Sequence, residues 1–202
     1  EYAWQVMCVL NSVAAKHHGH LSVLDFGGSL GSSYFQHRKL LDLLPEVHWC
    51  VVEQPELVAF GKAELEDESL RFSGTIAEAV DLNRPNVVLF GSVLQYLPSP
   101  REILASIFST GIGSIVIDRT AFHTADKDRL TIQRVSPEIY DASYPAWFLS
   151  LQAMKRDFER GGYRLVTEWI CDDHYPLEGL ETSFRGMIFE RSIPSRDVGP
   201  AN

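Results

Sequence analysis

The sequence is poor in cysteine and in long apolar runs. Its three cysteines, Cys8, Cys50 and Cys171, lie far apart and show no metal or redox spacing. We therefore interpret them as small buried apolar residues of a protein in a reducing compartment. No apolar run could span a bilayer and no signal peptide is recognisable, so we expect a cytoplasmic protein without a membrane span. The chain begins with Glu1 rather than Met, which is consistent with a missing N-terminal segment.

The chain also lacks an excess of positive charge. It has 18 Lys and Arg against 27 Asp and Glu, a formal net charge of -9. Proteins that bind nucleic acid usually carry a basic stripe, so we expect no nucleic-acid partner, whereas a small substrate or a nucleotide sugar stays open. With 202 residues, 45% of them hydrophobic, the chain can bury one core. We expect a single domain over residues 1–192 and a flexible tail over residues 193–202.

Apolar runs typical of strands alternate with helical patterns in the first part of the chain. Strands are expected at residues 21–26, 47–53, 70–73, 86–90 and 114–118. Short links between strand and helix favour a parallel sheet, and near-continuous apolar runs indicate that helices cover both of its faces. Residues 163–170 and 184–190 have no helical pattern between them. We expect these two strands to be antiparallel neighbours at the sheet edge.

Residues 119–144 break this alternation and show little period. The segment carries Arg119, His123, Gln133, Tyr140 and Tyr144. Long irregular segments inside a compact domain are usually functional, so we predict a lid or substrate segment here. A final helix is predicted from the helical spacing of Trp147, Leu151, Met154 and Phe158.

A glycine-rich stretch follows the first predicted strand. It reads Asp25-Phe26-Gly27-Gly28-Ser29-Leu30-Gly31 and leads into a helical segment. Glycines let a ligand approach the backbone, and the helix N-terminus offers unpaired N–H groups. The spacing is not the G-x-G-x-x-G of dinucleotide sites. An acid beside the turn instead suits a ligand with a cationic amino group and no pyrophosphate.

Glu53 ends the second predicted strand, 22 residues beyond Gly31. A carboxylate at this place can accept hydrogen bonds from both ribose hydroxyls and repels a 2′-phosphate. Ligands of open α/β sheets bind outside the carboxyl ends of the strands. The candidate ligand-binding residues at four such ends are Asp25, Gly27, Gly28, Ser29, Gly31, Tyr34, Glu53, Gln54, Thr75, Ile76, Gly91 and Ser92.

These motifs together resemble the class I S-adenosylmethionine-dependent methyltransferases. The glycine stretch is similar to the family's D/E-x-G-x-G-x-G, with Ser29 in place of the middle glycine. Glu53 falls where the family has its ribose-binding acid, and residues 91–97 resemble its fourth-strand segment. The resemblance covers nearly the whole chain. It implies a Rossmann-like, doubly wound, seven-stranded sheet with an antiparallel C-terminal strand, and S-adenosylmethionine as the cofactor.

A narrower resemblance joins several shorter segments. Residues 24–34, 52–55, 94–97 and 118–120, together with Gln133, 139–140 and 143–147, look like a small group of predicted bacterial methyltransferases. Members of that group are often linked with surface-polysaccharide gene clusters. That link says little about the substrate of this chain. We predict O- or N-methylation of a small-molecule or sugar-type acceptor.

Methyl transfer from a sulfonium is an in-line displacement, so the protein mainly positions two reactants. His123 is our candidate general base, and Arg119 our candidate for holding an anionic acceptor. Tyr96, Gln133, Tyr140 and Tyr144 are further candidates for the acceptor pocket.

No metal site is expected from the sequence. His17, His18 and His20 form a loop group without a carboxylate among them, and Asp172-Asp173-His174 is typical of a turn. Two other functions stay open. One is a binding protein that keeps the cofactor fold without catalysis, and the other is an NAD-dependent oxidoreductase, which the glycine spacing disfavours.

Overall fold

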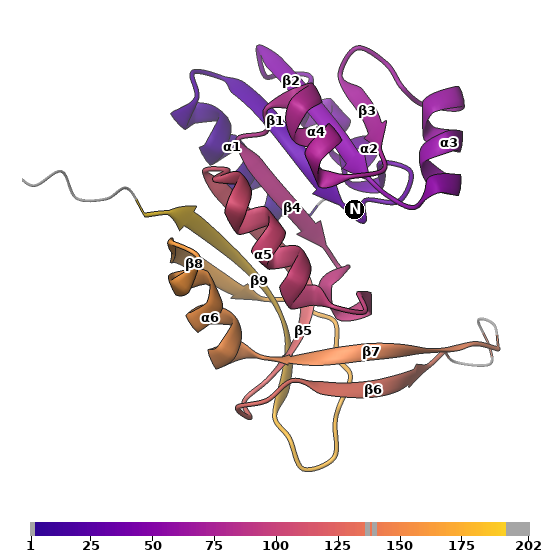
Figure 1. Ribbon diagram of the computed structural model, residues 1–202, viewed down its shortest axis with the longest axis vertical. Helices are drawn as coiled ribbons and strands as arrows, with labels where there is room; N and C mark the ends of the chain where they lie inside the picture. Colours follow the sequence, from indigo (N-terminus) through magenta and orange to yellow (C-terminus); the bar gives the residue numbers. More distant parts are fainter. Residues whose placement is uncertain (1–2, 136–137, 139–140, 193–202) are drawn as a thin grey trace, which may run out of the picture.

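The computed structural model describes residues 3–135, 138 and 141–192. Nine strands form one mixed sheet, and helices lie on both of its faces (Figure 1). The predicted α/β class is therefore confirmed, whereas the predicted number of seven strands is wrong. Among the described residues no helix is both long and apolar enough to cross a lipid bilayer.

Five parallel strands build the part of the sheet that carries the glycine turn. They are β1 (His20–Phe26), β2 (Glu46–Val52), β3 (Leu70–Ser73), β4 (Val87–Gly91) and β5 (Ser114–His123), in the spatial order β3-β2-β1-β4-β5. The order reverses between β1 and β4. This is the place in an open α/β sheet where two adjacent connections leave in opposite directions and a crevice opens.

Helices cover the two faces in separate groups. Apolar residues of α1 (Trp4–Lys16), α2 (Ser32–Leu41) and α3 (Pro55–Glu64) pack in one core cluster with Leu21 and Val23 of β1. Those of α4 (Ile76–Asn83), α5 (Pro100–Thr110) and α6 (Leu151–Arg160) pack in a second cluster with Leu24. Successive side chains of a strand point to opposite faces, so a buried run such as Leu21–Asp25 serves both clusters.

The helix boundaries follow the signals in the sequence. Pro55 and Pro100 stand at the first positions of α3 and α5, where a missing N–H costs nothing. The Thr75 side chain accepts a hydrogen bond from Glu78 N–H and caps α4. Gly111 ends α5 with a φ of 71°, the left-handed conformation that glycine adopts without strain.

The last two strands confirm the predicted antiparallel pair. They are β8 (Tyr163–Ile170) and β9 (Thr182–Arg191), and β9 also pairs antiparallel with β5. In this way β9 lies between β5 and β8, and the C-terminal pair extends the sheet on the side of β5.

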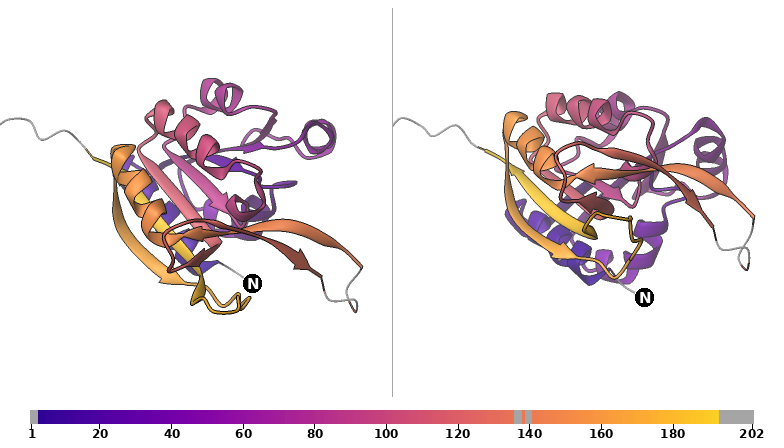
Figure 2. Two further views of the ribbon diagram at one scale, coloured as in Figure 1. Left: turned by 60° about the horizontal axis from the view of Figure 1, so that its bottom comes forward. Right: turned by 90° about the horizontal axis from the view of Figure 1, so that it is seen from below.

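The segment expected to be irregular contains a β-hairpin, which corrects the prediction for residues 119–144. The fifth strand continues to His123, and β6 (Arg129–Arg134) and β7 (Ser143–Ser150) pair antiparallel. Trp147, expected on a helix, lies in β7, and α6 begins only at Leu151. The hairpin projects from the rest of the molecule (Figures 1 and 2) and is mostly exposed along β6. A strand with so little burial gives no clear apolar period.

The hairpin joins the sheet only at the far end of β5. The pairing of β4 with β5 ends at Gly91 and Asp118. Further along β5, two residue pairs connect it to β7: Phe122 with Leu149, and His123 with Ser150. Between them the pairing of β5 with β9 shifts register, and Arg119 has a φ of 48°. The irregularity therefore separates a part of β5 that supports β4 from a part that supports the hairpin.

Candidate functional site

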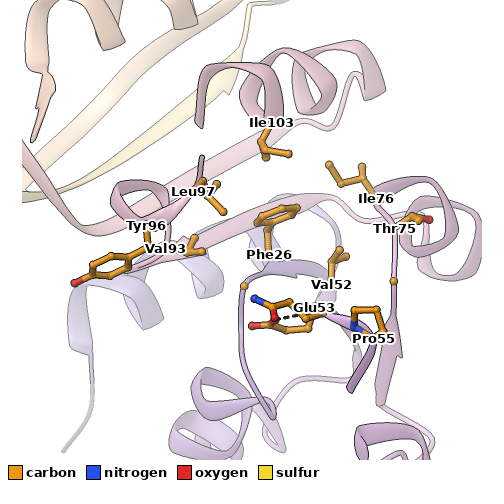
Figure 3. A pocket seen from close by; sticks show the side chains of 13 residues that line it. Phe26, Val52, Glu53, Pro55, Thr75, Ile76, Val93, Tyr96, Leu97 and Ile103 are labelled. Carbon is orange, nitrogen blue, oxygen red and sulfur yellow. Dashed lines mark hydrogen bonds between the residues drawn. The ribbon is translucent and has the colours of Figure 1, made fainter. Parts of the chain in front are cut away.

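A cavity of about 530 Å³ lies at the carboxyl ends of β1, β2 and β3. In Figure 3, Glu53 and Pro55 stand on one side of it, and Leu97 and Ile103 stand on the opposite side. Its wall also includes η1 (Leu94–Tyr96), a short 3-10 helix after β4. The lining residues are Phe26, Gly27, Val52, Glu53, Gln54, Pro55, Gly74, Thr75, Ile76, Val93, Tyr96, Leu97 and Ile103.

The turn after β1 requires its glycines. A Cβ on Gly27 would lie 2.3 Å from Val93 Cγ2, and one on Gly28 would lie 2.4 Å from Asp25 Oδ2. Gly27 and Gly31 have φ values of 70° and 83°, in the left-handed region. Ser29 has a φ of 55°. A residue with a Cβ thus occupies a left-handed position at the point where the resembling motif has its middle glycine.

Glu53 is held against this turn. Ser29 N–H donates to its Oε1 at 3.0 Å, and Gln54 N–H donates to its Oε2 at 2.8 Å. The side chain lines the cavity and is half-buried. Two backbone donors fix the orientation of the carboxylate, and each of its oxygens keeps a lone pair for a further hydrogen bond. The carboxylate is thereby positioned to accept from a ligand's hydroxyl groups.

Asp25 lies beneath the turn and is almost completely buried, with 1% exposure. Trp49 Nε1–H donates to its Oδ2 at 3.0 Å, while Oδ1 has no hydrogen-bond partner among the described residues. Burial raises the pKa of this carboxyl to about 7, against the opposing effect of the Trp49 hydrogen bond and with a smaller contribution from the Glu53 charge. A cation above the turn would stabilise the ionised form.

Most of the remaining cavity wall is apolar, and none of it carries a cationic side chain. Val52, Ile76, Val93 and the residues opposite them present hydrocarbon, and the lining includes neither Lys nor Arg. Gly74 and Thr75 are fixed by Glu78, which accepts from Gly74 N–H at 3.2 Å and donates its own N–H to the Thr75 side chain. The apolar part of this wall suits a flat aromatic ring, and the lining has no cationic side chain for a phosphate group.

The predicted ligand-binding residues divide into three groups. Those that line the cavity are Gly27, Glu53, Gln54, Thr75 and Ile76. Asp25, Gly28, Ser29 and Gly31 belong to the turn or support it. Tyr34, Gly91 and Ser92 do not line the cavity: Tyr34 packs edge-on in the core at 3% exposure, and Gly91 and Ser92 end β4.

Sequence reasoning missed the apolar half of the wall. Phe26, Val52, Val93, Leu97 and Ile103 carry no group that marks a ligand site, and each also fits an ordinary core pattern. Two of these residues could have been predicted from their position in the sequence, since Phe26 directly precedes Gly27 and Val52 directly precedes Glu53.

Three of the acceptor candidates meet beside the cavity. Tyr96 Oη donates to Gln133 Oε1 at 3.4 Å, and the rings of Tyr96 and Tyr144 are 5.5 Å apart in an edge-on arrangement. Gln133 and Tyr144 are register partners across the hairpin. Gln133 also lines a second cavity of about 170 Å³ between the hairpin and the segment Tyr175–Leu177. Tyr140, the fourth candidate, lies outside the described residues.

Arg119 and His123 do not reach either cavity. Arg119 forms an ion pair with Asp173, with Nε and Oδ2 3.2 Å apart. His123 is 2% exposed, and its Nδ1 accepts from Ala125 N–H at 3.0 Å.

No protein-family model and no curated protein sequence matches the chain. Solved structures do. The N-terminal domain of EvdMO1, crystallised in the presence of SAH and D-fucose, matches with a TM-score of 0.55 and 14% identity, over 91% of this chain and 82% of that one. Magnesium protoporphyrin IX methyltransferase (ChlM) from Synechocystis PCC 6803 with bound SAM matches with a TM-score of 0.59 and 12% identity, over 94% and 79%. The glycopeptide N-methyltransferase MtfA, complexed with SAM, matches with a TM-score of 0.59 and 10% identity, over 86% and 87%.

These likenesses show the fold. The chain has the Rossmann-like fold of class I methyltransferases, mostly parallel with antiparallel C-terminal strands. The hairpin of β6 and β7 accounts for the two strands beyond the expected seven.

Proposed function

We propose that the protein is an S-adenosylmethionine-dependent methyltransferase that acts on a small-molecule or sugar-type acceptor, at oxygen or nitrogen. The observation that carries this proposal is the geometry of Glu53. Its carboxylate is fixed at the cavity wall by Ser29 and Gln54 N–H groups, next to a glycine turn that a Cβ would block. Two neighbours of the same fold that were crystallised with SAM, ChlM and MtfA, are methyltransferases, and EvdMO1 was crystallised in the presence of SAH, which supports the proposal.

The cavity lining suits this cofactor, and the glycine turn does not have the G-x-G-x-x-G spacing of dinucleotide sites. Glu53 would accept hydrogen bonds from the ribose hydroxyls. The apolar side chains of Val52 and Ile76 would pack against the adenine ring. The buried Oδ1 of Asp25 has no hydrogen-bond partner among the described residues. The negative charge of this carboxylate would favour binding of the cofactor's ammonium group above the turn. A pyrophosphate would find no cationic side chain in the lining.

The cofactor supplies an activated methyl group, so the residues of this chain mainly orient two reactants and exclude water. Gly27 would allow the cofactor to approach the protein backbone closely, and Tyr96 forms the part of the wall that contacts the hairpin. We infer that the acceptor is held between η1 and the hairpin, where Tyr96, Gln133 and Tyr144 offer two ring faces and an amide. The catalytic roles predicted for His123 and Arg119 stay predictions.

A ligand-stability measurement tests the class of ligand. We expect S-adenosylhomocysteine to raise the Tm of the protein in a concentration-dependent way, because it binds only the folded state, and we expect NAD to leave the Tm unchanged. If NAD raises the Tm and S-adenosylhomocysteine does not, the proposal is wrong. Turnover separates an enzyme from a binding protein: pools of sugars, lipids and small acids are screened for acceptor-dependent formation of S-adenosylhomocysteine.

The acceptor position is tested with Tyr144→Ala, using the first acceptor found in that screen. Loss of one aromatic face is expected to lower kcat/KM about three- to tenfold, the effect of one ring contact. The affinity for S-adenosylhomocysteine is expected to stay within twofold of the original. Leu130→Ala is the matched control, since Leu130 is exposed on the same hairpin and lines neither cavity. Equal activity of both variants would place the acceptor elsewhere.

A further inference from the structure

Two histidines and a glutamate meet at the amino ends of β1 and β2. His20 is the register partner of Glu46, and His48 follows Glu46 by two positions on the same strand. Because side chains alternate between the faces of a strand, Glu46 and His48 point to one face, and His20 lies beside them on that face. In the sequence, His20 belongs to a group of loop histidines that has no carboxylate nearby. The parallel pairing of β1 and β2 brings the carboxylate of Glu46 next to His20.

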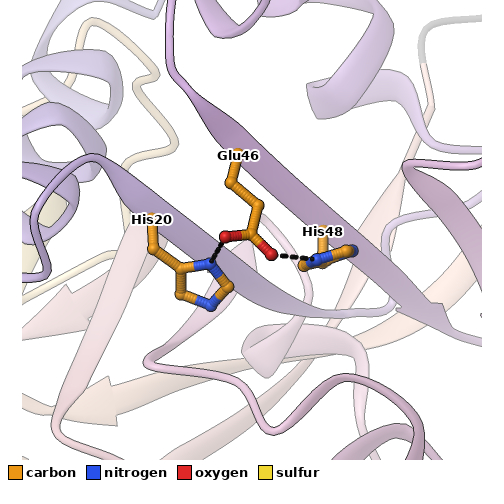
Figure 4. A group of neighbouring side chains, drawn as sticks. All are labelled: His20, Glu46 and His48. Carbon is orange, nitrogen blue, oxygen red and sulfur yellow. Dashed lines mark hydrogen bonds and ion pairs between the residues drawn. The ribbon is translucent and has the colours of Figure 1, made fainter.

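The three side chains are close and oriented toward one another (Figure 4). Glu46 Oε2 lies 2.9 Å from His20 Nδ1, and Glu46 Oε1 lies 2.9 Å from His48 Nε2. One nitrogen or oxygen of each residue lies within 4.8 Å of the others, and no other group of this kind occurs in the part of the chain that the structure describes.

We propose that His20, Glu46 and His48 form a binding site for a divalent transition metal ion, with Zn²⁺ as the best match. Zinc binds imidazole nitrogen and carboxylate oxygen at about 2.0–2.2 Å, which places neighbouring donors of a tetrahedral site about 3.3 Å apart. The three donor atoms, one from each residue, lie within 4.8 Å of one another, so small side-chain rotations would bring them to this spacing. The ion replaces two hydrogen bonds, and three protein ligands leave one position for water.

The ligand types decide between metals. Calcium and magnesium prefer oxygen ligands only, whereas imidazole suits zinc, copper and nickel. The side chains of His20 and His48 are 36% and 39% exposed, so an ion can enter without rearrangement of the fold. The net charge of -9 also favours cations near the surface.

This site is separate from the methyl-transfer chemistry. The glycine turn lies at the carboxyl end of β1, and a seven-residue strand places the two ends about 20 Å apart. None of the three residues lines the large cavity or the hairpin cavity. The ion therefore acts as a link between β1 and β2, and the proposal does not depend on the proposed function.

The test uses untagged protein dialysed against a chelator and titrated with Zn²⁺ in a calorimeter. We expect one ion per chain with a dissociation constant on the order of 10 µM or lower, and a higher Tm with zinc than with chelator. His20→Ala, Glu46→Ala and His48→Ala are each expected to weaken binding about tenfold or more. His17→Ala and His174→Ala are the controls, since both residues are exposed histidines outside the group.

Two results overturn the proposal. One is the absence of heat and of Tm change up to about 1 mM Zn²⁺, which would leave the group as a pair of hydrogen bonds. The other is equal zinc affinity of the three ligand variants and the original chain, which would place the ion elsewhere. Cobalt substitution gives an independent readout, because the visible absorption of a four-coordinate nitrogen and oxygen site should disappear in His48→Ala.

Discussion

Replacement of Glu53 by alanine is expected to weaken the binding of S-adenosylhomocysteine by more than tenfold. The variant would lack the hydrogen bonds that the Glu53 carboxylate is proposed to accept from the ribose hydroxyls, and hydrogen bonds to a charged group contribute about 1.5–3 kcal/mol each. A factor of ten in affinity corresponds to about 1.4 kcal/mol, so one such bond is enough. The turn also loses an anchor, because Ser29 N–H donates to Glu53 in the free protein. Isothermal titration calorimetry measures the change.

Glu56→Ala is the matched control for this experiment. Glu56 is exposed in the first turn of α3, three residues away, so the variant removes the same charge without touching the cavity. Glu53→Gln, which keeps an acceptor and removes the charge, should fall between the two. An affinity of Glu53→Ala within twofold of the original, with unchanged circular dichroism, would mean that the ribose does not contact this residue.

Asp25→Asn is expected to stabilise the free protein at pH 8 and to weaken its binding of S-adenosylhomocysteine. Burial raises the pKa of Asp25 from 3.8 to about 7, so the folded protein holds this proton more tightly than the unfolded chain does. Between pH 3.8 and 7 the unfolded chain has released the proton and the folded protein has not. The free energy of unfolding therefore falls as the pH rises through this window, by up to about 4 kcal/mol.

The Asp25→Asn variant cannot titrate at this position. Its free energy of unfolding should therefore not fall between pH 3.8 and 7 through this residue. At pH 4 the two proteins are expected to have similar free energies of unfolding, and at pH 8 the variant should be more stable, as measured by urea unfolding across the pH range. Asp81→Asn, at an exposed position of α4, should keep the original profile. If Asp25→Asn keeps it too, Asp25 is not the group that responds to pH. The gain in stability and the loss of binding would together mark a strained functional residue.

The buried parallel strands and the glycine turn could be predicted from the sequence because each gives a strong local signal. Runs such as residues 49–52 are apolar on both faces, and the strand ends coincide with small or polar residues. The same runs also predicted which strand ends meet. Gly27, Glu53 and Thr75 line one cavity, as the rule for carboxyl ends in open sheets requires.

The hairpin could not be predicted, because its stability comes from a few distant contacts. β6 buries none of its residues fully, and β7 is held by pairing with the end of β5 and by the Trp147 Nε1–H hydrogen bond to Leu97 O at 3.0 Å. Neither leaves a period in the sequence. The same reason applies to the neighbourhood of Arg119, since its partner Asp173 lies in a loop before β9. The group of His20, Glu46 and His48 was missed because it depends on the register of two strands.

The attachment of the hairpin to β5 has a consequence for how this fold can change. Two residue pairs connect β7 to β5, and both lie beyond the irregularity at Asp118 and Arg119. Insertions or deletions between Ala125 and Pro145 leave the register of β1, β4 and β9 untouched, because none of these strands pairs with the hairpin. The hairpin, which would recognise the acceptor, can therefore diverge in sequence or be replaced by another segment. The strands that would bind the methyl donor keep their register.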